Sequence, residues 1–377
     1  MLRLLSLWLF VIVANAGSVH GSCQQHHCVA VIDAGSTGSR LHIYAYDLDK
    51  SNTPVKINEL WSKKITPGLA TIDPTPSVIN AYFIDLFANT PEQNMPVYLY
   101  ATAGMRLFSQ AQQQKYYNLI QQWFKTKPQW QLKASQTIPG DKEGLFGWLA
   151  VNYQLGTLSS TEKPLVGVMD MGGASVQVVF PIQKTTNVDQ SDLIEVNIYG
   201  RKLKLFDRSF LGLGQTLVSQ QFLDTPSCFA NNYKLPSGSS AQGDAASCQL
   251  NVSKLINTVH AANNIVQPVL TANPVNSWYV IGGLPMLLEK EPFQFKGNYF
   301  TSEQLLQQAN SKLCQKKWQD LQSQYPTNEF IYNSCLVSSY YYALMVNGYG
   351  LKPKQPINYL PSTKQADWTL GVVLHQQ

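Results

Sequence analysis

The chain has 377 residues and a formal net charge of +5, and only 14% of its residues are charged. This length predicts roughly two domains, with enough chain to bury a sizeable core. The low charge, spread without any basic block, argues against a nucleic-acid-binding protein and gives only weak attraction for anionic substrates.

The N-terminus has the pattern of an export signal. Arg3 precedes an apolar run from Leu4 to Val13, and Ala14-Asn15-Ala16 is a small-x-small cleavage site. We therefore expect residues 1–16 to be a signal peptide. The alternative is an uncleaved anchor helix, but the apolar run is short for a bilayer span of about 20 residues. No later segment is long and apolar enough to cross a membrane, so we expect a soluble, exported protein, either periplasmic or extracellular.

The cysteine content fits that compartment. An even number of cysteines in an exported chain suggests disulfides, and six cysteines allow 15 pairings. Proximity along the chain favours Cys23–Cys28, Cys228–Cys248 and Cys314–Cys335. For the first pair a metal site is the alternative, because His26 and His27 lie between the two cysteines.

In the first part of the chain, "CVAVIDAGSTGSRLHIYAYDL" from Cys28 predicts a strand, a turn and a second strand. Pro and Asn then interrupt residues 51–66. Residues 97–100 predict a buried strand and residues 109–124 a Gln-rich helix. Pro139 predicts the start of another helix, with Glu143 on the same face as Gly147 and Val151.

In the second part, strands are predicted at 165–169 and 176–180, after a polar connector. Residues 231–251 are expected to form a surface loop closed by Cys228–Cys248. A strand with a Gly-Gly turn is expected near residues 277–288, an amphipathic segment at 303–325 and an apolar helix or strand at 334–350. The alternation of strands and helices, with one strand–turn–strand unit used twice, predicts an α/β fold with an internal duplication.

The repeated turn has a chemical meaning. Each copy places an Asp, Asp33 or Asp170, at the end of an apolar strand and follows it with Gly and Ser. Glycine lets the backbone approach an anion closely, and successive N–H groups form a concave anion site. A carboxylate beside that site repels phosphate but holds a divalent cation, usually through water. Two such turns facing each other would clamp a phosphate chain from both sides.

These turns resemble the two phosphate loops of the actin/Hsp70/sugar-kinase superfamily. Further motifs resemble the five apyrase conserved regions of the apyrase-type ecto-nucleoside triphosphate diphosphohydrolases, in the right order across nearly the whole mature chain. The motifs are "DAGSTGSR" at 33–40, "ATAGMR" at 101–106, "DKEGLFGWLAVN" at 141–152, "DMGGASVQ" at 170–177 and "WTLG" at 368–371. The intervening regions look shorter and less Cys-rich than those of animal membrane-bound members, and in this the chain is similar to bacterial members.

The resemblance implies a two-lobed fold with duplicated RNase H-like domains and the active site in the cleft between them. Lobe one would comprise residues 28–138 plus 361–377, and lobe two residues 139–360. A hinge motion between the lobes would open the cleft. The implied activity is hydrolysis of nucleoside tri- and diphosphates to the monophosphate, with Ca²⁺ or Mg²⁺ as cofactor, by a protein that we expect to be a monomer.

The resemblance also implies a role for each matching residue. Glu143 would be the general base for the attacking water, which Ser175 and Gln177 help to place. Asp33, Asp170 and Thr102 would order the water shell of the cation, and Arg106, Trp148, Asn152 and Trp368 would shape the site. Tyr340 would stack on the nucleobase, with residues 282–285 on the other side of the base, although three consecutive tyrosines leave this register open. The phosphates would be held by Ser36, Thr37, Gly38, Gly172, Gly173, Ala174 and Ser175.

Several alternatives remain at this point. Glu143 taken alone fits a carboxylate that opens a helix, and Arg40 and Arg106 fit either substrate ligands or structural ion-pair partners. An exopolyphosphatase shares the Asp-Gly turns, but the 141–152 and 368–371 motifs and the export signal argue against it. An actin-like or chaperone-like ATP-binding module, or a sugar kinase, is disfavoured by export to a compartment poor in ATP.

Overall fold

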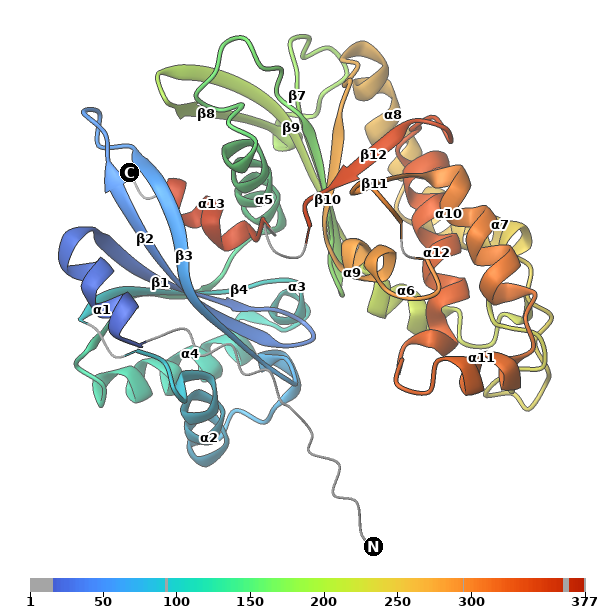
Figure 1. Ribbon diagram of the computed structural model, residues 1–377, viewed down its shortest axis with the longest axis horizontal. Coiled ribbons are helices and arrows are strands. Elements are labelled where there is room, and N and C mark those ends of the chain that lie inside the picture. Colours follow the sequence, from blue (N-terminus) through green and yellow to red (C-terminus); the bar gives the residue numbers. More distant parts are fainter. Residues whose placement is uncertain (1–15, 92–93, 294, 362–365, 376–377) are drawn as a thin grey trace, which may run out of the picture.

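We describe a computed structural model of the protein over residues 16–91, 94–293, 295–361 and 366–375. Two β-sheets lie on either side of a central pair of helices (Figure 1). We call the first sheet with its outer helices lobe one. Its strand order is β3-β2-β1-β4-β5, with β1 (His27–Ala34), β2 (Ser39–Leu48), β3 (Pro54–Ile65), β4 (Met95–Ala101) and β5 (Trp130–Thr137).

The second sheet and its helices form lobe two. Its strand order is β11-β12-β10-β6-β7-β9-β8. The strands are β6 (Gly167–Met171), β7 (Ser175–Pro181), β8 (Leu193–Ile198), β9 (Arg201–Leu211), β10 (Trp278–Gly282), β11 (Tyr299–Thr301) and β12 (Pro356–Tyr359).

The two sheets repeat one topology. In lobe one, β1 is antiparallel to β2 and parallel to β4, and β2 is antiparallel to β3. In lobe two, β6 is antiparallel to β7 and parallel to β10, and β7 is antiparallel to β9. The parallel pair β4–β5 has its counterpart in β10–β12, and β8 and β11 extend the edges of the second sheet. The predicted α/β fold with an internal duplication is confirmed.

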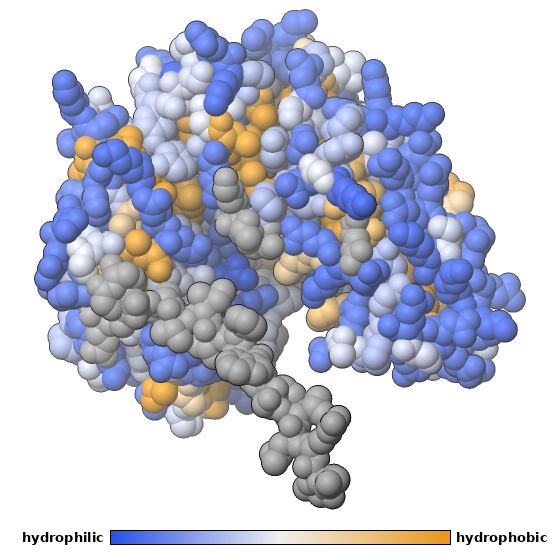
Figure 2. Space-filling model, in the orientation of Figure 1, coloured by the Kyte–Doolittle hydropathy of each residue, from blue (hydrophilic) through white to orange (hydrophobic). Residues whose placement is uncertain are grey.

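Helices surround both sheets. In lobe one, α1 (Ala16–Gln25), α2 (Pro76–Phe87) and α4 (Gln110–Lys125) pack on the sheet, and the short α3 (Ala103–Arg106) follows β4 at the cleft. In lobe two the helices are α6 (Gln215–Gln221), α7 (Ala245–Lys254), α8 (Ala262–Ala272), α9 (Gly283–Glu289), α10 (Ser302–Ala309), α11 (Trp318–Gln324) and α12 (Ser334–Tyr342), of which α6 and α9 begin at the cleft. Hydrophilic residues dominate the outer surface over α10 and α11 (Figure 2).

The central strands are apolar on both faces because each lies between two layers of helices. On β1, Ala30 and Ile32 pack into the outer core of lobe one, whereas Val29 and Val31 pack toward the middle of the molecule. Val168 on β6 reaches the same central core from lobe two. The alternation along one strand thus joins each lobe to its own helices and to the shared centre.

The shared centre is built from α5 (Gly140–Gln154) and α13 (Trp368–Leu374), which cross between the sheets (Figure 1). Their backbones meet so closely that a Cβ on Gly371 would lie 2.0 Å from the carbonyl oxygen of Phe146. Only glycine permits this approach. The "WTLG" motif therefore has a packing role: its glycine sets the crossing of the two helices.

Most predicted elements are confirmed, including the strands around both turns and the helices that begin near Ser109 and Pro139. Residues 54–65 form a strand, β3, that was not among the predicted strands. Pro54 is tolerated there since it starts a strand at the edge of the sheet. Residues 231–251 are only partly a loop, because Asp244 caps α7 through the backbone N–H of Ser247.

The later segments are also clarified. The amphipathic stretch 303–325 is two helices, α10 and α11, separated by a π-helical turn at 310–314. The apolar stretch from Ser334 is a helix, α12, which continues as a π-helical turn to Gly348. The expected division of the lobes falls just before α5 and just after β12, and we keep those exact boundaries as a proposal.

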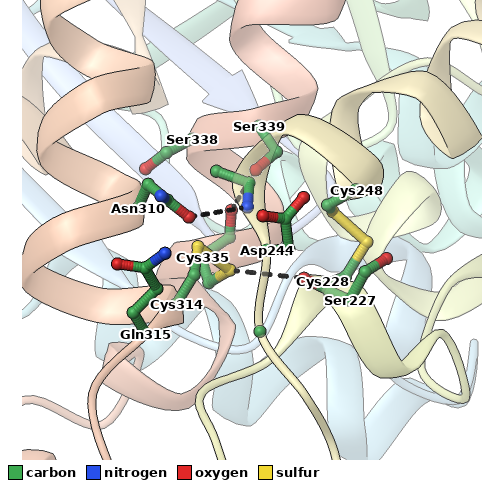
Figure 3. Close-up of a disulfide and its surroundings, with 12 residues drawn as sticks. Ser227, Cys228, Asp244, Cys248, Asn310, Cys314, Gln315, Cys335, Ser338 and Ser339 are labelled. Carbon is green, nitrogen blue, oxygen red and sulfur yellow. Dashed lines mark hydrogen bonds between the residues drawn. A yellow bond between two sulfur atoms is a disulfide. The ribbon is translucent and has the colours of Figure 1, made fainter.

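Three disulfides form with the expected pairing, Cys23–Cys28, Cys228–Cys248 and Cys314–Cys335, which removes the metal-site alternative for the first pair. Their Cα atoms lie 5.4, 4.8 and 5.2 Å apart, which suits a disulfide. The second and third bridges are neighbours beneath the helices of lobe two (Figure 3). There the Cys335 sulfur lies 3.9 Å from the carbonyl oxygen of Ser227, beside Cys228.

The expected signal peptide lies almost wholly outside the described residues, of which Ala16 is the first. Within the four described ranges, no helix combines the length and the apolar character needed to span a bilayer.

Candidate active site

The two Asp-Gly turns occupy equivalent places in the two lobes. Four residues, 35–38, separate the paired Ala34 and Ser39 in lobe one, and four, 172–175, separate Met171 and Val176 in lobe two. The turns face each other closely: a Cβ on Gly173 would lie 2.6 Å from Ser36 Oγ and 3.1 Å from Thr37 Cγ2. The absence of a side chain at Gly173 lets the two turns meet across the cleft.

A cleft between the lobes gathers most of the predicted site residues, and the surface is hollowed between the lobes (Figure 2). Its walls come from both turns, the starts of α3 and α5, the end of β10 and the start of α13. The predicted residues that line it are Asp33, Ser36, Thr37, Gly38, Thr102, Glu143, Asp170, Gly172, Gly173, Ala174, Ser175 and Trp368.

Glu143 lies in the first turn of α5 and is only 7% exposed. Its Oε2 atom forms an ion pair with the Arg106 guanidinium and lies 3.4 Å from Gln177 Nε2. Both contacts use the same oxygen, so within the described chain Oε1 is left for another partner. The contact with Arg106 supports the alternative in which this residue is a structural ion-pair partner. Its partner is Glu143, the predicted general base.

Gln177 connects Glu143 to its neighbours. Its side-chain Nε2 donates to Ser175 Oγ at 2.8 Å and to Ser209 Oγ at 3.0 Å. Ser175 ends the lobe-two turn, and Ser209 lies opposite Gln177 on β9. This fan of short polar contacts fixes the positions of the groups that surround the Glu143 carboxylate.

The electrostatics of Glu143 reflect two opposing influences. Burial raises the pKa of its carboxyl, because the charged form loses solvent, and the Arg106 cation beside it opposes that rise. A buried carboxylate with a raised pKa in a cleft suits a group that takes a proton.

Two further carboxylates face the cleft from the two lobes. Burial raises the pKa of Asp33 well above its ordinary value, and the charges of Asp367 and Glu143 raise it further. Burial and Glu143 do the same for Asp170, which is 7% exposed. Oδ1 of Asp33 has no hydrogen-bond partner among the residues that the structure describes. These carboxylates are therefore short of positive charge.

Trp148 and Asn152 do not line the cleft and act from behind it. Trp148 Nε1 donates to the carbonyl oxygen of Val166 at 2.8 Å, and Asn152 Oδ1 accepts from the Val166 amide at 3.0 Å. Both residues are fully buried. They fix α5 to the chain just before β6, so their influence on the site passes through the position of the helix.

The structure does not place Tyr340 where it could contact a nucleobase, contrary to the prediction from the sequence. Its side chain is fully buried in the lobe-two core, and its hydroxyl donates to the carbonyl oxygen of Leu213. The next residue, Tyr341, donates to Gln215 Oε1 at 2.8 Å, and Gln215 lines the cleft. Residues 282–285, which were expected on the other side of the nucleobase, do reach the cleft: Gly282, Gly283 and Pro285 line it, together with Met286.

Sequence reasoning missed Ser209 and Asp367. Ser209 reaches the site only through the pairing of β9 with β7, which no local motif announces. Asp367 lines the cleft and accepts from the Thr369 amide at 3.0 Å as the N-cap of α13. An Asp directly before an apolar helix was a usable signal for this cap.

The chain matches the model of the GDA1/CD39 (nucleoside phosphatase) family through residues 19–235 and 227–377, all but its first 18 residues. Ectonucleoside triphosphate diphosphohydrolase 1 from Mus musculus is 24% identical to this chain, over 92% of this chain and 80% of the mouse protein. Nucleoside-triphosphatase from Pisum sativum is 26% identical, over 90% of this chain and 86% of the plant protein.

Solved structures share the fold. Nucleoside triphosphate hydrolases from Neospora caninum superpose with a TM-score of 0.58 at 15% identity, over 96% of this chain and 95% of that one. A Ppx/GppA protein from Aquifex aeolicus gives 0.55 at 15% identity, over 92% and 96%. The duplicated sheets therefore have the actin-like fold, and the sequence match assigns the group within it: the chain belongs to the GDA1/CD39 (nucleoside phosphatase) family.

Proposed function

We propose that this protein hydrolyses nucleoside tri- and diphosphates to the monophosphate and phosphate, with Glu143 as the general base for the attacking water. Membership of the nucleoside phosphatase family gives the coarse activity, removal of phosphate from nucleotides. The observation that carries the finer proposal is the position of Glu143, between two facing phosphate turns and beside Gln177 and Ser175.

The residues of the cleft fit a divalent cation. Asp33 and Asp170 are carboxylates from opposite lobes, their pKa values are raised, and one Asp33 oxygen has no partner within the described chain. Oxygen ligands of this kind suit Ca²⁺ or Mg²⁺. No set of three or more His, Cys, Asp or Glu side chains in the described ranges is close enough to hold a metal directly. We therefore propose that Asp33, Asp170 and Thr102 hold the cation through water.

When bound, the cation would neutralise charge on the phosphates. The remaining chemistry belongs to the chain's own residues. The Ser36–Gly38 turn and the Gly172–Ser175 turn would bind phosphate oxygens from opposite sides. Glu143 would accept the proton of the water at its free Oε1, while Arg106 holds its other oxygen and keeps the carboxylate in place. Catalysis is then mainly positioning and charge stabilisation of an in-line attack.

Arg106 has a second consequence for this mechanism. Because burial favours the neutral acid, a base at this position needs a nearby cation to stay ionised at neutral pH. Arg106 supplies that cation from α3, in the "ATAGMR" motif, and it also lies 3.5 Å from Ser209 Oγ. The motif thus serves the site through Thr102 at its start and Arg106 at its end.

Three disulfides and the export pattern at the N-terminus support action in an oxidising compartment outside the cytosol. There the substrates would be nucleotides outside the cell or in the periplasm. We propose that the nucleobase of the substrate packs against a wall formed by Gly283, Pro285 and Met286, and not against Tyr340.

An exopolyphosphatase is the rival function, because Ppx/GppA proteins share the fold. The test is release of phosphate by the purified protein from ATP, ADP, AMP and a long polyphosphate, with Mg²⁺, with Ca²⁺ and with excess EDTA. We expect release from ATP and ADP, none from AMP, and loss of activity in EDTA. Release from polyphosphate alone would overturn the proposal, and full activity in EDTA would remove the cation from it.

A further inference from the structure

Two cationic side chains of lobe one, Arg40 and Lys64, line the cleft without a role in the mechanism above. Their place becomes clear when equivalent positions of the two lobes are compared. In lobe two, a row of paired residues runs from the turn across three strands: Asp170 on β6 faces Gln177 on β7, which faces Ser209 on β9. This is the row that surrounds Glu143. Side chains of directly paired residues lie on the same face of a sheet, so the row points as a unit toward the cleft.

The equivalent row in lobe one is Asp33 on β1, Arg40 on β2 and Lys64 on β3. The duplication places Arg40 where lobe two has Gln177, and Lys64 where lobe two has Ser209. All three residues of the row line the cleft. The two positions that hold neutral, hydrogen-bonded residues in lobe two therefore hold two positively charged residues in lobe one.

The surroundings of Arg40 and Lys64 neutralise their charge only in part. Arg40 forms a long ion pair, with 3.7 Å between its Nη1 and Asp367 Oδ2, which is beyond hydrogen-bond range, and its side chain is 31% exposed. Lys64 is exposed and has no ion pair or hydrogen bond with any residue that the structure describes. Like charges directly opposite each other on neighbouring strands are destabilising. An anion between them would relieve that repulsion.

The lobe-one turn gives the position of such an anion. Gly38 ends the turn, and a Cβ there would lie 3.2 Å from Lys64 Cε. The lysine stem thus runs beside the turn, and Arg40 follows two residues after Gly38. Both cations are therefore adjacent to the backbone that, in the proposed function, contacts the terminal phosphate.

We propose that Arg40 and Lys64 form a cationic clamp that binds the terminal phosphoryl group from lobe one and stabilises the charge on it during its transfer to water. The clamp rests on the proposed function, and it makes both residues catalytic in that reaction. An arginine presents several donors in a planar fork and a lysine a compact positive charge, so together they suit the oxygens of one phosphoryl group. The same clamp would hold inorganic phosphate, the product.

The experiment compares wild type with Arg40→Ala, Lys64→Ala and the double variant. Lys56→Ala is the matched control, because it removes the same charge from the same strand at an exposed position that pairs with Asp47. For each protein, kcat and KM are measured with ATP and Mg²⁺, the inhibition constant is measured for inorganic phosphate, and the melting temperature is recorded. Phosphate binding is also measured directly by calorimetry.

We expect Arg40→Ala to lower kcat by about 10²-fold, as loss of one preorganised transition-state contact does. The double variant should also weaken phosphate binding at least about tenfold, while Lys56→Ala leaves all values unchanged. Added guanidinium ion should partly restore the activity of Arg40→Ala, which a purely structural role for Arg40 would not allow. The melting temperature of Lys64→Ala should stay near the wild-type value, because Lys64 is exposed and its charge faces that of Arg40. Arg40→Ala also loses the ion pair with Asp367, so its melting temperature is compared with its kinetics on the same preparation.

The outcomes separate the clamp from the proposed function. If wild type hydrolyses ATP and the folded double variant matches it in kcat, KM and phosphate inhibition, the clamp is wrong and the proposed function stands. If wild type hydrolyses no nucleotide but binds phosphate through Arg40 and Lys64, the clamp stands and the proposed function falls. If Arg40→Ala fails to fold, Arg40→Lys and Lys64→Gln carry the test, and phosphate binding unchanged in both would overturn the clamp.

Discussion

The two rows of residues that face each other across the cleft divide the chemistry between the lobes. In the lobe-two row, Asp170 and Gln177 are buried and Ser209 is partly buried; Gln177 donates to Ser209 and lies beside Glu143. The lobe-one row, Asp33–Arg40–Lys64, is more exposed and carries charge at every position. After the Asp that begins each row, one duplicated scaffold thus carries neutral hydrogen-bonding residues in lobe two, Gln177 and Ser209, and two cations in lobe one, Arg40 and Lys64.

The difference teaches where precision is needed in this reaction. A water molecule must be oriented, which requires rigid, neutral hydrogen-bonding groups in fixed positions. A phosphoryl group and its cation need opposite charges nearby, and these charges can act from positions that are less precisely fixed.

The largest effect should follow from Glu143→Gln, at the end of the lobe-two network. Glutamine keeps the shape of the side chain but cannot accept the proton of the water, so kcat should fall by about 10²–10⁴-fold with little change in KM. Nucleotide binding, measured by calorimetry, should persist. A drop in kcat of less than about tenfold, together with a lower melting temperature, would mean that Glu143 only stabilises the start of α5.

A smaller effect should follow from Asp33→Asn or Asp170→Asn, the residues that begin the two rows. Loss of either charge weakens the water shell of the cation, so the Mg²⁺ concentration for half-maximal activity should rise by about 10–100-fold. Because each carboxylate is short of positive charge in the free protein, neither change should lower the melting temperature. Unchanged metal titrations for both variants would remove the cation from these positions.

The sequence predicted the parts of the site that are local in the chain. Both turns, with their flanking strands, and the helix that begins after Pro139 follow from short patterns of Asp, Gly, Ser and apolar residues. The family resemblance added the role of Glu143. These features are legible because the residues that cooperate in them lie within a few positions of one another.

The parts that the sequence did not predict depend on distant pairing. Ser209 and Lys64 enter their rows only through strand register, and β3, which begins at Pro54, was not among the predicted strands. The prediction that Tyr340 contacts the nucleobase was wrong for a different reason, the position of the residue around its helix. Consecutive residues of a helix point about 100° apart, so a one-residue ambiguity among three tyrosines decides between the core and the Gln215 side of the cleft.

A more modest effect should follow from Gln177→Ala and from Ser209→Ala. Each removes neutral hydrogen bonds in the lobe-two row, and a net contribution of about 0.5–1.5 kcal/mol per bond corresponds to roughly two- to tenfold in rate. The two residues contact each other, so the double variant should lose less than the product of the single losses. Kinetics on both singles and the double variant measure this; strictly multiplicative losses would show that the row does not act as a unit.

The smallest kinetic effect should come from Tyr340→Phe, which tests how the lobe-two turn is supported. The Tyr340 hydroxyl donates to the carbonyl oxygen of Leu213, and the next residue, Gly214, packs directly under the turn: a Cβ there would lie 2.2 Å from the Ala174 nitrogen. Losing this buried hydrogen bond should lower the free energy of unfolding by about 1 kcal/mol. KM for purine and pyrimidine nucleotides should change less than about twofold, because the ring remains in the core. Thermal melting and kinetics on one preparation separate the two roles: a KM that rises severalfold for one class of base, at unchanged stability, would return Tyr340 to the base pocket.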